Sequence, residues 1–138
     1  PSPRPGLTQP TPPRVSAELW VKAHIRRCGL HAIPAMVVRR GDNTAGAIFI
    51  KVNHLGPGCM VLAPASSMDS SNLDGGRQWR RALGDERGDE RGDERGDGLV
   101  AEAEADAYMA RQLNMDPDLW LLEIEDRQGR HLLEDILE

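Results

Sequence analysis

The sequence has 138 residues, of which 39% are hydrophobic and 28% are charged. This composition is typical of one soluble globular domain with polar segments attached. No run approaches the roughly 18 apolar residues of a membrane helix, and the Pro-rich start lacks the apolar stretch of a secretory signal. Only two cysteines, Cys28 and Cys59, are present, so we expect reduced thiols in a cytoplasmic protein rather than a disulfide framework.

The net charge of −5 is unevenly distributed along the chain. Residues 1–83 hold 11 Lys and Arg against 4 Asp and Glu, residues 84–98 hold 3 against 7, and residues 99–138 hold 3 against 11. Such asymmetry fits either a basic binding surface or two halves that neutralise each other after folding. We favour the second interpretation, because strands from both halves are expected to share one sheet.

The first 14 residues are rich in proline and predict a disordered tail. A helix is then expected from Ala17 to Cys28, with Ser16 as its N-cap and Gly29 as the residue that ends it. A spacing of 100° per residue gathers its apolar side chains on one arc, which predicts that the helix docks on an apolar surface. These side chains are Ala17, Trp20, Val21, His24, Ile25 and Cys28.

Four extended segments follow this helix. The strings are AMVVRR at 35–40, AIFIKVNH at 47–54, CMVLAP at 59–64 and RQWRRAL at 77–83. The second string carries apolar residues on both faces, which is usual for a central strand. The charged fourth string is expected to be an edge strand.

The C-terminal part predicts a second helix at 100–114 and a strand at 119–126. A tight turn at 126–129 is expected to lead into a sixth strand, RHLLE at 130–134. The resulting order α-β-β-β-β-α-β-β predicts a small single α+β domain over residues 15–138, with a mostly antiparallel sheet and helices packed on it.

The most conspicuous string is GDERGDERGDERGDG at 84–98, which spells Arg-Gly-Asp three times. Glycine at every fourth position disfavours a helix, and no apolar side chain is available to offset the entropy of ordering. We therefore expect a flexible, acidic, low-complexity loop. An integrin-binding role is disfavoured because nothing in the sequence indicates secretion.

Several blocks of the chain resemble the alphaproteobacterial domain of unknown function 1491 family. The resemblance runs from about Val15 to Glu134 and rests on RRGDNTAG (39–46), DPDLW (116–120) and EIEDRQGR (123–130). It implies a small bacterial cytoplasmic domain, but no activity and no site residues. The Pro-rich start and the GDER repeat depart from the family pattern without interrupting these blocks.

One cluster has residue types that bind zinc: His24, Cys28 and His31. A helix stacks the first two, because they are four residues apart, and Cys59, His54 or His131 could supply a fourth ligand. However, His24 and Cys28 lie on the apolar arc, where a thiol and a hydrogen-bonded imidazole also pack as core residues. We favour the packing interpretation and predict no cofactor.

A second cluster has the residue types of acid–base catalysis. Glu123 and Glu125 share a strand face, Asp126 follows them, and His131 would return across the expected hairpin. The alternative is a solvated face of an edge hairpin whose acids pair with the basic first half. We favour that alternative and lean against an enzyme.

A third cluster is basic and could bind phosphates or nucleic acid. Its members are Arg39, Arg40, Lys51, Arg80 and Arg81, with Arg26 and Arg27 from the first helix. Exposed aromatic residues, which stack on bases, are scarce here. Intramolecular pairing with the acidic half is therefore the favoured interpretation of these charges.

These observations leave three hypotheses. The first is a non-catalytic protein-binding or adaptor module, which the edge strands and the uneven charge favour. The second is a nucleic-acid or phosphate binder that uses the basic first half, and the third is a small enzyme that uses the Glu123, Glu125 and His131 hairpin. The partner, the ligand and the oligomeric state stay open.

Overall fold

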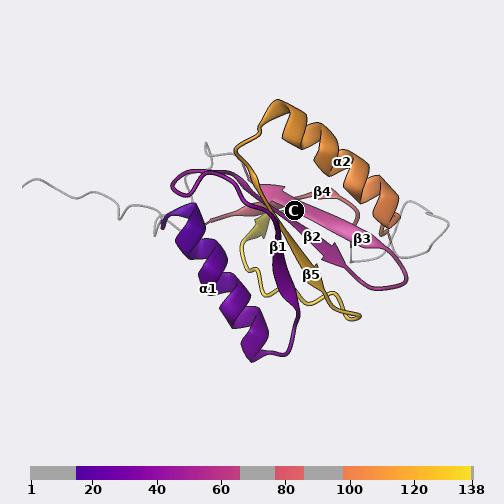
Figure 1. The fold of residues 1–138 in the computed structure, drawn as a ribbon. Coiled ribbons are helices and arrows are strands. Elements are labelled where there is room, and N and C mark those ends of the chain that lie inside the picture. Colours follow the sequence, from indigo (N-terminus) through magenta and orange to yellow (C-terminus); the bar gives the residue numbers. More distant parts are fainter. Residues whose placement is uncertain (1–14, 66–76, 86–97, 138) are drawn as a thin grey trace, which may run out of the picture.

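The computed structural model describes residues 15–65, 77–85 and 98–137 (Figure 1). The expected tail at 1–14 and most of the expected repeat loop, 86–97, lie outside the described residues. The described residues form one α+β fold whose elements are α1 (Ala17–Leu30), β1 (Ala35–Arg39), β2 (Ile48–Asn53), β3 (Cys59–Pro64), β4 (Trp79–Leu83), α2 (Glu102–Met115), β5 (Trp120–Glu125) and β6 (Ile136–Leu137).

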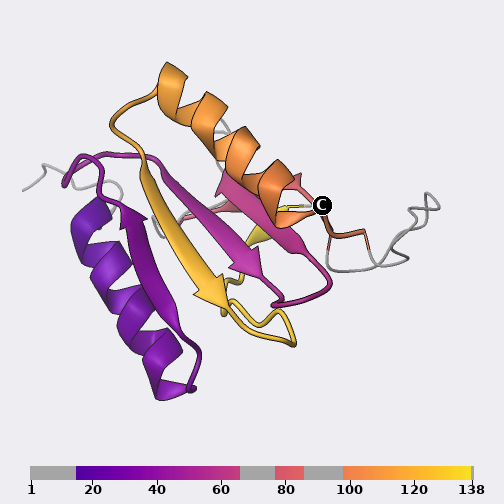
Figure 2. The ribbon, with the colours of Figure 1, turned by 45° about the vertical axis from the view of Figure 1, so that its right-hand side comes forward.

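The six strands form one sheet in the order β1-β5-β2-β3-β4-β6 (Figure 2). β5 lies between β1 and β2, antiparallel to the first and parallel to the second, and β6 is parallel to β4. The sheet is therefore mixed, and the expectation of a mostly antiparallel sheet is wrong. The reason is the crossover through α2, which returns the chain to the sheet in the direction of β2, as a parallel pair requires.

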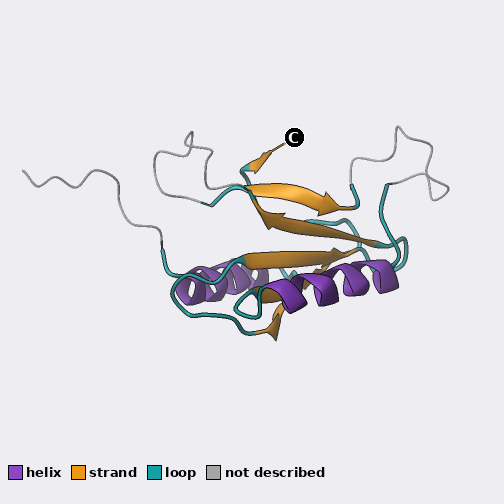
Figure 3. Cartoon of the chain, turned by 90° about the horizontal axis from the view of Figure 1, so that it is seen from above, coloured by secondary structure: helices purple, strands orange, loops and turns teal. Residues whose placement is uncertain are grey.

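The last strand also differs from the prediction. The string RHLLE at 130–134 does not form a strand, and β6 is the short segment Ile136–Leu137 that pairs with β4. β5 already has a neighbour on each side, so no position remains for a hairpin partner. Instead Leu132 and Leu133 pack against the core as the chain runs to the opposite edge of the sheet, where β6 lies beside the C-terminal label (Figure 3).

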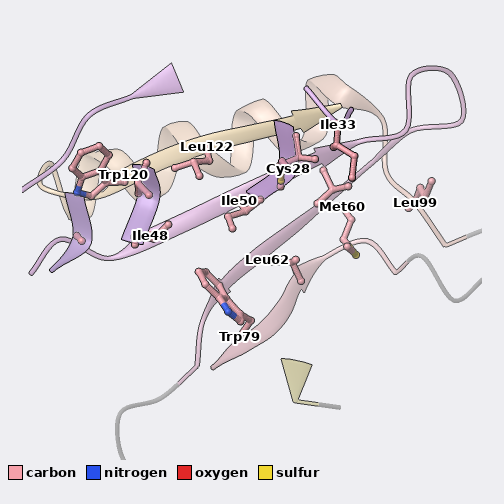
Figure 4. Packing of buried hydrophobic residues seen from close by; sticks show 14 residues of the cluster. Cys28, Ile33, Ile48, Ile50, Met60, Leu62, Trp79, Leu99, Trp120 and Leu122 are labelled. Carbon is pink, nitrogen blue, oxygen red and sulfur yellow. The ribbon is translucent and has the colours of Figure 1, made fainter. Parts of the chain in front are cut away.

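The two helices cover opposite faces of the sheet (Figure 1). The face under α1 buries Ile48, Ile50 and Val52 of β2, whereas Phe49 of the same strand lies in the cluster under α2. Figure 4 shows Ile48 and Ile50 beside Leu122 of β5 in the first cluster. This alternation, apolar on both faces, confirms that the second expected strand is central.

The predicted start and the predicted buried side of the first helix are confirmed, whereas its predicted end is not. Ser16 is the N-cap, and its hydroxyl accepts a hydrogen bond from the backbone N–H of Leu19 at 3.3 Å. The expected end at Gly29 is wrong, because the helix continues to Leu30 and the residue with positive φ is Ala32, at 60°. The buried side of the helix is the predicted one.

Glycine is required at Gly129, in the turn after β5. Its φ is +73°, and an added Cβ would lie 2.2 Å from Cε1 of His54. Gly29 has open space around it and lies inside α1.

We predict opposite effects for alanine at these two glycines. Gly129→Ala should destabilise the fold by about 2 kcal/mol or more, because it combines a strained φ with a steric clash. Gly29→Ala should stabilise it by up to about 1 kcal/mol, because alanine is the better helix former. Urea unfolding of both variants measures the difference. Equal stabilities would contradict the described packing of His54 on the turn.

Candidate functional site

The most concentrated charges in the described structure surround Lys51, in the middle of β2. Its side chain points to the α2 face and the residue is only 4% exposed. The Nζ atom lies 2.7 Å from Oε2 of Glu102 and 2.9 Å from Oδ1 of Asp106, both on α2, and 3.7 Å from Oε1 of Glu123 on β5. One buried cation thus joins the first turns of α2 to the two central strands.

The electrostatics keep this lysine charged. Burial by itself lowers the pKa of Lys51, but the hydrogen bonds that its Nζ donates to Glu102 and Asp106, together with the charge of Glu123, outweigh this effect, so the pKa lies above its ordinary value. A lysine held in its protonated form is neither a nucleophile nor a general base. The cluster is therefore an internal ion pair between the basic and acidic parts of the chain.

The proposed acid–base residues are not brought together. Glu123 faces Lys51 and accepts a hydrogen bond from Nδ2 of Asn53 at 3.3 Å. His131 lies on the α1 side, where its backbone carbonyl accepts a hydrogen bond from Nε2 of His24 at 2.9 Å. The separation follows from the wrong prediction of a hairpin at 130–134. Glu125 lies at the end of β5 beside Asn53 on β2.

Asp126, the remaining acidic candidate, organises the turn after β5. Its carboxylate accepts from Nη2 of Arg130 at 2.7 Å and from the backbone N–H groups of Gln128 and Arg130. The hydrogen bond from Arg130 is the main reason that the pKa of Asp126 falls to about 2. A carboxylate with these partners stabilises the turn and is not a proton donor near neutral pH.

The zinc candidates are engaged in packing. His24 is buried and stacks on Trp20 at 4.7 Å between ring centroids. Its Nε2 donates to the carbonyl of His131 and its Nδ1 accepts from Nη2 of Arg27 at 2.9 Å, so both ring nitrogens are occupied. His31 is exposed, with Nδ1 donating to the carbonyl of Arg27.

The cysteines lie apart, and burial dominates the chemistry of both. Cys28 belongs to the core under α1 and Cys59 to the core under α2. Burial raises the pKa of the Cys28 thiol, and raises that of Cys59 to about 11. Over residues 15–65, 77–85 and 98–137, no three His, Cys, Asp or Glu side chains are placed to hold a metal ion.

The basic candidates are spread over the sheet and do not form one patch. Arg39 and Arg40 lie at the end of β1, whereas Arg80 and Arg81 lie on β4, with three strands between them. Lys51 is buried under α2. Arg40 is held by Oε2 of Glu18 at 2.6 Å and lies 5.2 Å from the ring centroid of Trp120. Arg81 is 3.7 Å from Asp85.

Sequence reasoning did not predict that β1 is an outer strand. It expected the charged string RQWRRAL at 77–83 to be an edge strand, and this is wrong, because β4 lies between β3 and β6. Met36, Val37 and Val38 are 38%, 42% and 52% exposed, although all three are apolar. On its other side, β1 pairs with no strand of the described chain. The available signal was a short apolar string followed directly by Arg39 and Arg40, since apolar strands with one open side often end in charged residues.

The strings RRGDNTAG and DPDLW meet at one junction. An added Cβ at Gly41 would lie 2.3 Å from the backbone oxygen of Asp118, so only glycine allows the two segments to approach. The indole Nε1 of Trp120 donates to the carbonyl of Asp42 at 2.7 Å. The carbonyl of Thr44 accepts from the first backbone N–H of α1, at Ala17. These strings thus fix α1, β1, β2 and β5 relative to one another.

The residues at this junction fall within a stretch that matches a known family. The model of DUF1491, described as a protein of unknown function, matches residues 15–134. The chain belongs to the DUF1491 family. The match spans the chain from the start of α1 to the segment before β6, which confirms the resemblance drawn from the sequence.

Solved structures of DUF1491 proteins are similar to this chain. A crystal structure of a DUF1491 protein from Caulobacter crescentus CB15 is 32% identical in sequence, with a TM-score of 0.67. The aligned region covers 90% of this chain and 98% of the Caulobacter chain. An NMR structure from the same organism is 34% identical, with a TM-score of 0.67 and coverage of 90% and 97%. Protein Atu0922 from A. tumefaciens is 27% identical, with a TM-score of 0.62 and coverage of 81% and 86%.

No curated protein matches this DUF1491 chain. Within the described residues, neither helix is long and apolar enough to cross a membrane. The family therefore supplies a fold and a set of relatives, and the chemistry has to be argued from the residues themselves.

The buried lysine leads to a stability prediction. Lys51→Met should destabilise the protein by about 3 kcal/mol, because it leaves the half-buried Glu123 without its cation. Adding Glu123→Gln to that variant should recover part of the loss. Urea unfolding of the single and double variants measures both effects. A single variant as stable as the wild type would contradict the account of the cluster.

The buried histidine leads to a pH prediction. Burial, the largest cause, lowers the pKa of His24 to about 4, so the unfolded chain binds a proton at pH values where the folded chain does not. Stability should therefore fall by about 3 kcal/mol as the pH drops from 6.5 to 4. The His24→Gln variant should lose correspondingly less over this range. Urea unfolding of both proteins at half-unit pH steps measures the difference. If the stability of the variant falls as much as that of the wild type, His24 is not the cause of the pH dependence.

Proposed function

We propose that this DUF1491 protein is a non-catalytic protein-binding module that captures an extended segment of a partner on β1. The observation that carries the proposal is the outer side of β1, which pairs with no strand among residues 15–65, 77–85 and 98–137, in a strand where Met36, Val37 and Val38 are exposed. Soluble proteins usually protect such strands with charge, bulges or covering segments. β1 has a register shift between Val37 and Arg39 and a charged end at Arg39, but the segment from Ala35 to Val37 before the shift is regularly paired with β5. An extended peptide that adds to a sheet edge gains backbone hydrogen bonds and buries alternate side chains.

The register of β1 identifies the backbone groups that face the open side. The N–H of Glu125 donates to the carbonyl of Pro34 at 3.0 Å. Bonded and non-bonded pairs alternate in an antiparallel ladder. Since Met36 is opposite Glu123 and Val37 is opposite Leu122, the polar groups of Met36 point to β5 and those of Val37 point outward.

The other two hypotheses receive less support from the geometry. Catalysis by Glu123 and His131 is disfavoured, because these residues lie on opposite faces of the sheet. A nucleic-acid surface built from Arg39 and Arg80 is disfavoured, because the strands that carry them are not neighbours. The internal ion pairs of Lys51 and Arg40 also remove two cations from such a surface.

We predict that Val37→Pro weakens peptide binding without unfolding the protein. Proline removes the outward N–H and is tolerated on edge strands, so the loss of one hydrogen bond should lower the affinity about tenfold. The probe is a labelled ten-residue peptide of alternating Thr and Val, followed by fluorescence anisotropy.

Met36→Pro is the matched control, because it removes an N–H that points to β5. It should lower the melting temperature clearly more than Val37→Pro does. If Val37→Pro binds the peptide as the wild type does, β1 is not the binding strand.

A further inference from the structure

One side of α1 runs along the open strand. Glu18, Lys22 and Arg26 are spaced four residues apart and therefore lie on the same side of the helix. The carboxylate of Glu18 reaches Nη2 of Arg40, just after β1, at 2.6 Å. Lys22 and Arg26 follow at successive turns of the helix, on its solvent-facing side, with Arg26 turned furthest from the buried side that holds Ala17 and Val21.

This side of α1 is basic and only partly neutralised. Glu18 is shared between Arg40 and Lys22, whose Nζ lies 3.3 Å away. The Lys22 side chain is 68% exposed. Among the described residues, no carboxylate lies within 4.0 Å of a side-chain nitrogen of Arg26. Glu18 is the one acidic residue between positions 15 and 40, against five Lys and Arg.

The pleat of β1 determines which side chains of an added strand project to the α1 face of the sheet. Val37 is paired with Leu122, which belongs to the core under α1. Met36 is paired with Glu123, whose side chain faces Lys51 on the α2 side. In an added strand, every second side chain would thus project to the face that α1 covers, which is the face where the long side chains of Lys22 and Arg26 are available.

We propose that the segment captured by β1 is acidic, with Asp or Glu at every second position on the α1 face and apolar residues between them. This inference rests on the proposed function and names the partner class for that strand. The acidic side chains pair with Lys22 and Arg26, while the alternate apolar side chains cover Met36. Complementary charge along the edge selects such a segment over a neutral or basic one.

Three labelled ten-residue peptides test the proposal by anisotropy: alternating Glu and Val, alternating Thr and Val, and alternating Lys and Val. The Glu peptide should bind about tenfold more tightly than the Thr peptide at low salt, and the difference should shrink at high salt. The Lys peptide should bind least. The variant Lys22→Glu with Arg26→Glu should reverse the order of the Glu and Lys peptides. Arg111→Glu, an exposed cation on α2, should leave the order unchanged.

Each contrary result has a separate meaning. Equal binding of the Glu and Thr peptides, still sensitive to Val37→Pro, would overturn the charge inference and leave the proposed function intact. If Val37→Pro changes the binding of none of the peptides, both the charge inference and the proposed function are overturned. A dimer in sedimentation that Val37→Pro converts to a monomer would make a second copy the occupant. A single-stranded oligonucleotide that displaces the Glu peptide and binds more tightly would make nucleic acid the ligand.

Discussion

The parallel pairing of β2 with β5 is the constraint on which the rest of the structure depends. It places the last long strand between the first two, so that β5 separates β1 from β2. The pairing requires a crossover, and α2 supplies it on the face opposite α1. Since β5 then has two neighbours, the chain after it must leave for the far edge, and β1 becomes the outer strand on its own side.

The same pairing explains the charge distribution. Lys51 of the basic part and Glu123 of the acidic part are register partners in β2 and β5, and α2 adds two more carboxylates. A buried ion pair of this kind fixes which surfaces meet more than it adds net stability. The other cations of the first half divide between the two sides of the sheet: Lys22 and Arg26 lie on α1 and Arg39 at the end of β1, whereas Arg80 and Arg81 lie on β4.

The sequence was sufficient for features set by local physics and insufficient for those set by long-range pairing. Residue types and their spacing were enough to predict the N-cap at Ser16, the buried side of α1 and the apolar residues on both faces of β2. The neighbours of β5 could not be predicted in this way, because the same alternating string fits a hairpin or a parallel pair. That single error moved the sixth strand and joined Glu123 to His131 in a site that the fold does not form. The packing of His24 and Cys28 was favoured over zinc from the sequence, because both lie on the apolar arc.

The central functional claim is that the outward backbone of β1 is the binding surface. Amide hydrogen exchange of the ¹⁵N-labelled protein, with and without the Glu-Val peptide, tests it most directly. Without peptide, the Val37 amide should exchange quickly, because it points to solvent, while the amides of Ile50 and Leu122 in the central strands stay protected. With peptide, the Val37 amide should become protected. A bound peptide that leaves Val37 exchanging at its free rate would contradict the account.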